Sequence, residues 1–347
     1  MELSAGKYWS LRRLADERGF FRMTAVDQRP PIRNLVAQKR GVKEAAYQDV
    51  GDVKALLIQE LNAHSSAMLL DPGYAYPHAV QHVDPRKGLL VTLEQFEFEE
   101  KPRGRLTRIY PNWSVAKIKR LGADGVKLML FYRPDAASEV NEEQQTLVEK
   151  VGRECREHDL AFLLEPLVYP FAGAANASHD YVEDSTKRPE LVIDTVREFA
   201  KPRYGVDIFK LETPVPANQV PDPDSNDAAV AETRRWFEAI DRELDRPWVM
   251  LSAGAGMEPF RRIVSFAFAA GASGYLAGRA LWWQAFQSFP DMEAFRAALR
   301  KDSIAYIEGI GQRLTRDGTP WWQRPAFKDG VKLRHAGPEF YRRYEVA

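Results

Sequence analysis

Eight short apolar runs follow one another along the chain, and a polar segment separates each run from the next. They are rich in Val, Leu, Ile and Phe and lack the strict alternation of a half-exposed strand. Parallel strands that are covered on both faces have this composition. The runs span residues 21–27, 66–71, 88–94, 125–132, 161–169, 207–215, 247–254 and 274–280. The pattern therefore predicts a parallel sheet with one strand for each run.

The polar segments between the runs carry helical signals. Residues 141–160 have acidic side chains early, basic side chains late and a helical apolar period, and residues 227–244 and 257–272 repeat this pattern. Strands that alternate with helices in this number predict an α/β fold, a (β/α)8 TIM barrel with an N-terminal helix and a C-terminal extension. An open doubly wound sheet is the alternative, and the regular count of runs argues against it. We expect residues 1–325 to form a single barrel domain, and residues 326–347 to form a tail that packs on the barrel or on a partner subunit.

Composition excludes several kinds of partner. The 347 residues are 45% hydrophobic and have a formal net charge of zero, so nothing favours nucleic acid or an anionic membrane as a general partner. The longest apolar stretch is too short to span a bilayer, and residues 1–19 carry charges throughout, unlike a signal peptide. The single cysteine, Cys155, excludes an internal disulfide framework and fits a reducing compartment. We therefore expect a cytoplasmic globular protein.

Ionisable side chains recur near the ends of the predicted strands. Barrel enzymes work at the C-terminal ends of their strands, where the strand-to-helix loops gather. The residues at or near these positions are Asp27, Lys127, Glu165, Lys210, Glu212 and Arg279. Side chains two apart on a strand share a face, so Lys210 and Glu212 are expected to point the same way. The positions predict one polar site at the mouth of the barrel.

Lys210 stands in the middle of an apolar strand, "DIFKLETPV", which is an unusual place for an ammonium group. Burial lowers the pKa of a lysine, and a second ammonium nearby, from Lys127, would act in the same direction. A free amine can attack a carbonyl and form a Schiff base, which makes a neighbouring carbon–carbon bond breakable. Glu165 or Asp27 could then move the protons. The alternative is structural, since Lys210 with Glu165, or Lys127 with Asp27, could form a buried ion pair.

A loop of small residues, "LSAGAGMEPF", joins the seventh predicted strand to a helix. Backbone N–H groups at such a turn, with a helix behind them, bind phosphate or sulfonate. Barrels often hold phosphate between their last two loops, and the motif "AGRALW" adds a guanidinium at the end of the eighth strand. We expect Ser252, Gly254, Gly278 and Arg279 to bind the substrate there. Pro259 breaks the glycine pattern of a dinucleotide site.

Several motifs agree in order and spacing with one known family. They are "AVDQR", "SSAMLLDP", "GADGVKLMLFY", "FLLEPLVY", "IFKLETPV", "LSAG" and "GRALW", and the agreement runs from about residue 7 to "TPWWQR" near residue 324. The chain resembles the tagatose-1,6-bisphosphate aldolase family, a set of class I barrel aldolases that also includes sulfofructose-phosphate aldolases. The resemblance implies a metal-independent retro-aldol cleavage without a cofactor.

The resemblance also implies a catalytic role for four residues. Lys210 corresponds to the family's Schiff-base lysine and Glu165 to its general acid/base. Lys127 and Asp27 match residues that contact substrate hydroxyls and tune the charge of the site.

Further matches concern the two ends of the substrate. Ser252, Gly254 and Arg279 match the side that binds the C1-phosphate of the ketose. Gln28 and Arg29 match residues near the other end of the sugar. The sequence departs from the family just after them, where the family has glycine and small residues and this chain has Pro30 and Pro31.

These prolines remove N–H donors from the loop over the distal end of the substrate. The loop of residues 169–189 and the tail beyond residue 325 also look unlike the short family versions. The sugar and the need for a second phosphate therefore stay open at this stage.

We expect a class I aldolase, an aldehyde-lyase that cleaves a tagatose-1,6-bisphosphate-like ketose (bis)phosphate to dihydroxyacetone phosphate and an aldehyde such as glyceraldehyde 3-phosphate. One alternative is an imine-forming aldolase or transaldolase for a sulfonated or other unusual sugar phosphate, and another is a non-enzymatic metabolite-sensing barrel. The expected partner is a small-molecule sugar phosphate, and the chain could form a homo-oligomer. Metal ligation is not expected, because His78 and His82 lack a third ligand nearby and "DPDSND" lacks the central glycine of a calcium loop.

Overall fold

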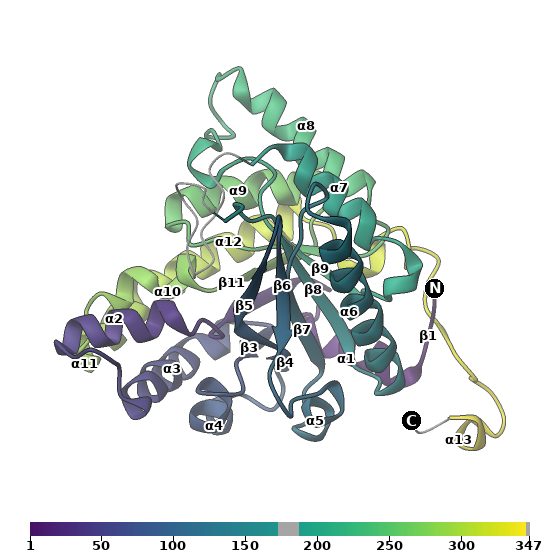
Figure 1. Ribbon diagram of the computed structural model, residues 1–347, viewed down its shortest axis with the longest axis horizontal. Helices are drawn as coiled ribbons and strands as arrows, with labels where there is room; N and C mark the ends of the chain where they lie inside the picture. Colours follow the sequence, from purple (N-terminus) through teal and green to yellow (C-terminus); the bar gives the residue numbers. More distant parts are fainter. Residues whose placement is uncertain (173–186, 345–347) are drawn as a thin grey trace.

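Eight parallel strands form a closed barrel, as the sequence predicts. The computed structural model describes residues 1–172 and 187–344, and Figure 1 shows the strands surrounded by helices. In their order around the barrel the strands are β10 (Trp248–Met250), β11 (Gly274–Ala277), β2 (Phe21–Ala25), β3 (Ala67–Leu70), β4 (Gly88–Thr92), β7 (Gly125–Phe131), β8 (Ala161–Leu167) and β9 (Ile208–Leu211). Each strand lies within one of the predicted runs, so the fold class is confirmed.

The strands are buried on both faces. Met23 and Ala25 of β2 and Ala161 and Leu163 of β8 belong to a buried cluster inside the barrel. On β8 the residue between them, Phe162, belongs to a second cluster under the surrounding helices. This double burial explains why the runs lack an alternation of apolar and polar residues.

Helices cover the outer face of the barrel (Figure 1). They are α2 (Pro30–Arg40), α3 (Tyr47–Leu61), α4 (Ala75–Ala79), α5 (Val115–Arg120), α6 (Ser138–Glu157), α7 (Pro189–Phe199), α8 (Ala229–Arg242), α9 (Met257–Ala270), α10 (Arg279–Phe286), α11 (Met292–Ala298) and α12 (Ile304–Asp317). The three helices expected from the sequence correspond to α6, α8 and α9. None of the helices in the described part of the chain is both long enough and apolar enough to cross a membrane.

The N-terminal mouth of the barrel is closed by apolar side chains from both ends of the chain. Helix α1 (Ala5–Leu14) contributes Leu11 and Leu14, and the segment after α12 contributes Trp321 and Phe327. These residues join the cluster inside the barrel. The opposite mouth, at the C-terminal ends of the strands, is therefore the one that can admit a substrate.

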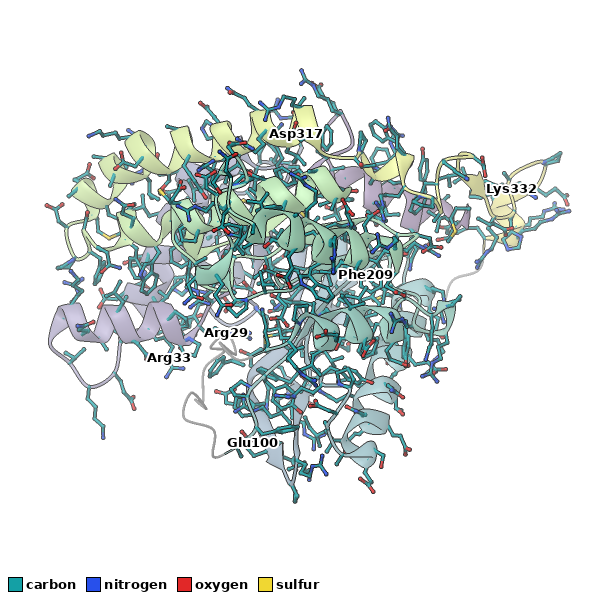
Figure 2. The ribbon with its side chains drawn as sticks, turned by 90° about the horizontal axis from the view of Figure 1, so that it is seen from above. Arg29, Arg33, Glu100, Phe209, Asp317 and Lys332 are labelled. Carbon is teal, nitrogen blue, oxygen red and sulfur yellow. The ribbon has the colours of Figure 1, made fainter. Side chains whose placement is uncertain are left out.

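The tail returns to the N-terminal residues of the chain. β1 (Glu2–Leu3) pairs in parallel with β12 (Lys332–Leu333), and the short helix α13 (Phe340–Arg343) follows. The N–H of Gly6 donates to the hydroxyl of Tyr344 at 2.8 Å. Figures 1 and 2 show this segment extending from the body of the molecule, with Lys332 at its outer part. The tail therefore lies on the side away from the open mouth.

A β-hairpin that the sequence did not predict follows β4. Its strands are β5 (Glu94–Lys101) and β6 (Gly104–Ile109), so the predicted third strand, residues 88–94, was too long at its end. The hairpin carries many charged side chains, which hid it from a search for apolar runs. It matters because Glu94 begins it at the mouth of the barrel.

An aromatic cluster holds the hairpin to the barrel. The guanidinium of Arg105 is buried, and its central carbon lies 4.3 Å from the ring centre of Phe98 and 5.1 Å from that of Tyr169. The backbone N–H of Arg105 donates to the Tyr169 hydroxyl at 2.8 Å. The backbone N–H of Phe131, at the end of β7, donates to the hydroxyl of Thr107 at 3.0 Å. The hairpin is thus fixed beside the ends of β7 and β8.

The expectation that Glu212 shares a face with Lys210 is wrong. β9 ends at Leu211, and the Glu212 carboxylate accepts the N–H of Val168 and pairs with the ammonium of Lys187, each at 2.7 Å. Glu212 therefore lies beyond the last residue of β9 and does not line the cleft with Lys210. Most of the long loop expected at residues 169–189, namely residues 173–186, lies outside the described residues.

Candidate active site

A cleft opens at the C-terminal mouth of the barrel. It encloses about 600 Å³, part of it open to solvent. The lining residues are Asp27, Gln28, Arg29, Pro30, Pro31, Phe96, Lys127, Met129, Phe131, Glu165, Leu167, Lys210 and Arg279. All four residues predicted to be catalytic line this one cleft, together with three of those predicted to bind substrate.

The strands place the charged groups directly above the apolar interior. Lys210 follows Ile208 by two residues on β9, and Glu165 follows Leu163 by two residues on β8. Ile208 and Leu163 face the inside of the barrel, so Lys210 and Glu165 face it one layer higher. Asp27 stands in the same relation to Ala25 at the end of β2. A layer of charge therefore rests on a layer of aliphatic side chains.

A buried pair below Asp27 fixes the backbone that carries it. Lys54 of α3 is fully buried, pairs with the carboxylate of Asp71 and donates to the backbone carbonyl of Val26 at 2.8 Å. Burial lowers the pKa of Lys54, although Asp71 opposes this shift. Because Val26 precedes Asp27, this hydrogen bond limits the movement of the Asp27 side chain.

Glu165 lies between the two lysines. Its Oε1 atom is 2.7 Å from Nζ of Lys210, and its Oε2 atom is 2.8 Å from Nζ of Lys127. The Lys127 ammonium also donates to Glu94 at 2.7 Å and to Asp27 at 3.1 Å. None of these five side chains is more than 9% exposed. The result is a buried network in which one ammonium meets three carboxylates.

This network shifts the pKa values of its members in a consistent way. Burial disfavours the ammonium of Lys127, but Asp27, Glu165 and Glu94 outweigh burial and raise the pKa of Lys127 above its usual value. Burial likewise opposes ionisation of Asp27, but Lys127, Lys210 and Arg29 hold the pKa of Asp27 well below its usual range. Burial raises the pKa of Glu94, and the nearby cations only partly counter it. Lys127 therefore stays charged.

Carboxylates separate the two lysines in the structure. Three of them surround Lys127, and one of the three, Glu165, also contacts Lys210. Both ion pairs of the structural alternative, Lys210 with Glu165 and Lys127 with Asp27, are present. They line an open cleft, however, and the contact of Lys210 with Glu165 is also the one that would let a proton pass between them.

Arg29 and Gln28 lie beside this network. Arg29 donates to the backbone carbonyl of Glu94 at 3.1 Å and to the hydroxyl of Tyr110 at 3.0 Å, and its guanidinium is 3.6 Å from the Glu94 carboxylate. Burial disfavours the charge of Arg29, but Glu94 raises the pKa of Arg29 above its usual value. Gln28 contacts the other side of the mouth, since a Cβ added to Gly278 would meet its amide nitrogen at 2.4 Å.

The loop between β10 and α9 meets Arg279 at the rim of the cleft. Gly254 has φ +82°, and a Cβ added there would meet the guanidinium carbon of Arg279 at 2.9 Å. Residue 254 therefore has to be glycine for two reasons, its left-handed backbone angle and the close approach of Arg279. Ser252 is buried two residues earlier, after the end of β10. Ser252, Gly254 and Gly278 do not line the cleft themselves, but Gly254 and Gly278 lie against Arg279 and Gln28, which do.

Replacing Gly254 with alanine should weaken substrate binding. The left-handed backbone should cost about 1–2 kcal/mol of folding free energy, measured by chemical denaturation. Displacing Arg279 should raise KM about tenfold with a smaller change in kcat, as expected from losing about 1.4 kcal/mol of binding.

Gly256→Ala is the matched control for this loop. Nothing lies within 4 Å of a Cβ added at Gly256, so KM and stability should stay near those of the unaltered protein. Equal KM values for the two variants would contradict the role given to the contact between Gly254 and Arg279.

Glu94 and Tyr110 are site residues that the sequence reasoning missed. Glu94 closes the run predicted as the third strand, so the rule that selected Asp27 could have selected it as well. Tyr110 follows β6 and carried no such signal, because only the fold of the hairpin brings its hydroxyl to Arg29. Among the described residues, no group of three or more His, Cys, Asp or Glu could hold a metal ion.

Comparison with known proteins finds related aldolases. The family model described as "DeoC/LacD family aldolase" matches residues 21–284. A tagatose 1,6-diphosphate aldolase of Listeria monocytogenes serotype 4b is 32% identical over 330 residues, which cover 93% of this chain and 96% of that protein. Tagatose 1,6-diphosphate aldolase 1 of Streptococcus mutans is 32% identical over 332 residues, which cover 93% of this chain and all of that protein.

Solved structures share the fold at lower sequence identity. Fructose-bisphosphate aldolase from Plasmodium falciparum, in complex with TRAP and an inhibitor, has a TM-score of 0.65 at 12% identity and covers 92% of this chain and 98% of its own. An archaeal fructose-1,6-bisphosphate aldolase whose catalytic lysine is bound to a carbinolamine intermediate has a TM-score of 0.56 at 16% identity, with 89% of this chain and 99% of its own covered. At these identities the likeness supports the fold alone.

The family match and the two relatives exclude the alternative of a barrel without enzymatic activity. Aldolases are aldehyde-lyases, and the match covers the strands that carry Asp27, Lys127, Glu165 and Lys210. This chain is an aldolase and belongs to the DeoC/LacD family.

Proposed function

We propose that this chain is a class I aldolase that cleaves a ketose phosphate through a Schiff base on Lys210, with dihydroxyacetone phosphate as one product. The observation that carries the proposal is the 2.7 Å contact between Lys210 and Glu165 inside a cleft that has Arg279 at its rim. The first substrate to test is tagatose 1,6-bisphosphate, because the relatives at 32% identity are named for it.

The imine would form by a balanced exchange of protons. Glu165 takes a proton from the ammonium of Lys210, and the free amine attacks the C2 carbonyl of the ketose. One proton of the attacking nitrogen moves to the new oxygen and gives the neutral carbinolamine. Glu165 then returns its proton to this hydroxyl, which leaves as water and gives the iminium. The 2.7 Å separation allows both transfers without an intervening water.

Cleavage would follow from the charge of the iminium. A carboxylate, Glu165 or Asp27, takes the proton of the C4 hydroxyl, the C3–C4 bond breaks, and its electrons move into the iminium to give an enamine. The aldehyde leaves first, and protonation and hydrolysis of the enamine release dihydroxyacetone phosphate. The fixed charge of Lys127 suits a contact with the substrate hydroxyls during these steps.

The phosphate would lie between the β10–α9 loop and Arg279. The helix N-terminus behind this loop and the guanidinium both favour an anion. Anchoring C1 there would direct C2 of the ketose toward Lys210, since Arg279 and Lys210 line the same cleft.

Borohydride reduction tests the proposal directly. Reduction in the presence of dihydroxyacetone phosphate should add a reduced three-carbon phosphate to the peptide that contains Lys210, as detected by mass spectrometry. Activity should persist in EDTA. No adduct on Lys210, or an adduct on another lysine with Lys210 unmodified, would sink the proposal.

A further inference from the structure

The part of the cleft opposite the β10–α9 loop has apolar walls. β4 lies four strands from β10 in either direction around the barrel, and β7 lies four strands from β11. Residues at the ends of β4 and β7 therefore stand across the mouth from Arg279. The side chains that line the cleft there and at the end of β8, here called the distal wall, are Phe96, Met129, Phe131 and Leu167.

The strands explain why the distal wall lies above the catalytic layer. Met129 and Phe131 follow Lys127 by two and four residues on β7, so all three face the inside of the barrel. Leu167 stands in the same relation to Glu165 on β8. A substrate bound to Lys210 with its phosphate at Arg279 would thus point its other end toward aliphatic and aromatic side chains.

The nearest helix N-terminus cannot bind an anion in the usual way. α2 begins at the cleft, and its first two residues, Pro30 and Pro31, both line the cleft. Neither proline has an N–H group, so two of the donors that would face an anion at this helix end are missing. The first backbone N–H of α2 with a hydrogen bond is that of Arg33, which donates to the carbonyl of Arg29 at 3.0 Å.

Cations near the distal wall are few and already engaged. Arg29 is held by Glu94 and Tyr110 through the hydrogen bonds described above. Arg33 is exposed and does not line the cleft; Figure 2 shows it on α2 near Arg29. The sequence of residues 173–186 contains no lysine or arginine. Among the described residues that line the cleft, Arg279 and Arg29 carry the guanidinium groups, and Arg29 is already held by Glu94 and Tyr110.

Two buried polar atoms at the mouth, one of them in Gln28 beside Gly278, are open to a sugar hydroxyl. In the described structure the Oε1 atom of Gln28 and the Nε atom of Arg29 are buried without a hydrogen-bond partner. Oε1 of Gln28 needs a donor, and Nε of Arg29 needs an acceptor. Hydroxyl groups of a sugar can serve as both, whereas a phosphate dianion offers only acceptors.

We propose that the enzyme acts on ketose 1-phosphates whose distal end carries a hydroxyl or a methyl group, so that the aldehyde it releases is not phosphorylated. This inference rests on the proposed function, because it assumes that dihydroxyacetone phosphate is bound through Lys210. A phosphate held against the distal wall would lose water without gaining a partner, which makes the 1,6-bisphosphate the poorer substrate.

The reaction in the direction of synthesis tests the distal end alone. Dihydroxyacetone phosphate is kept constant, and glyceraldehyde, lactaldehyde and glyceraldehyde 3-phosphate are compared as acceptors. The value of kcat/KM for each unphosphorylated aldehyde should be at least tenfold higher than that for glyceraldehyde 3-phosphate. If borohydride traps dihydroxyacetone phosphate on Lys210 but the phosphorylated aldehyde is preferred, this inference falls while the proposed function stands.

Two variants locate the cause of the preference. Phe96→Lys places an ammonium on the distal wall, and Phe96→Met is a neutral control of similar length. The ratio of kcat/KM for phosphorylated over unphosphorylated aldehyde should be at least tenfold higher in Phe96→Lys than in Phe96→Met. Arg33→Ala should leave the ratio of the unaltered protein unchanged. An unchanged ratio in Phe96→Lys, or a loss of activity toward glyceraldehyde 3-phosphate in Arg33→Ala alone, would overturn the inference.

Discussion

Replacing Lys210 with methionine should abolish the aldol reaction, lowering kcat by about 10⁴-fold or more. Methionine fills nearly the same space but has no nucleophilic nitrogen, so no imine can form. The protein should still fold, because Glu165 keeps its 2.8 Å contact with Lys127 when Lys210 is removed. The measurement is the steady-state rate of ketose phosphate cleavage, together with a circular dichroism spectrum that confirms the fold.

Lys210→Arg separates the nucleophile from the charge. Arginine retains a positive charge beside Glu165, but its guanidinium stays protonated and does not attack a carbonyl. Both variants should therefore be inactive and give no borohydride adduct. A Lys210→Arg protein with more than about one-tenth of the original kcat would show that the charge, and not the imine, is what the reaction needs.

Replacing Lys127 with methionine should have the largest effect on stability. The variant would leave the carboxylates of Asp27, Glu94 and Glu165 without the ammonium that they share. Removing one partner from a buried charge network typically costs about 3–5 kcal/mol of the free energy of unfolding. Urea denaturation at pH 7 measures this loss, and cleavage activity should fall as well because the charge that faces the substrate hydroxyls is gone.

The deficit of Lys127→Met should shrink as the pH falls from 8 to 5. In the intact protein Lys127 is the strongest of the groups that hold the pKa of Asp27 down against burial. Without Lys127, burial raises the pKa values of Asp27 and Glu94 in the folded state above those in the unfolded chain. A carboxylate whose pKa is raised in the folded state destabilises the fold at high pH. This loss of stability disappears as the carboxylate binds a proton at lower pH.

Glu94→Gln provides the matched control. Alone it removes one of three carboxylates around Lys127 and should destabilise the protein less than Lys127→Met. Combined with Lys127→Met it should recover part of the lost stability, because one uncompensated charge is gone. A Lys127→Met protein that loses less than about 1 kcal/mol and shows no dependence on pH would contradict the network.

The strands were predictable because the residue types in each strand depend on whether its two faces are buried. Burial on both faces selects Val, Leu, Ile and Phe regardless of what lies next in the chain, and so the runs revealed the barrel. The rule that barrel enzymes work at the C-terminal ends of strands then placed Asp27, Lys127, Glu165, Lys210 and Arg279 at one mouth, and the structure brings all of them into one cleft.

The hairpin and its consequences were not predictable in this way. β5 and β6 are rich in charged residues, and Arg105 is buried in the hairpin only because Phe98, Phe131 and Tyr169 surround it. The position of Glu212 was also wrong, because the end of β9 depends on contacts with residues far away in the sequence.

The barrel, and the strand on which each reactive group stands, can be predicted from the chain's residues, since strand composition and alternation depend on neighbours along the chain. The partners of those groups depend on the folded molecule. It brought Glu94 to Lys127 and Tyr110 to Arg29, and it placed Phe96 across the mouth from Arg279. The physical reason is that charge balance and wall polarity are sums over atoms close in space, and in a closed barrel those atoms come from strands that are distant in the chain.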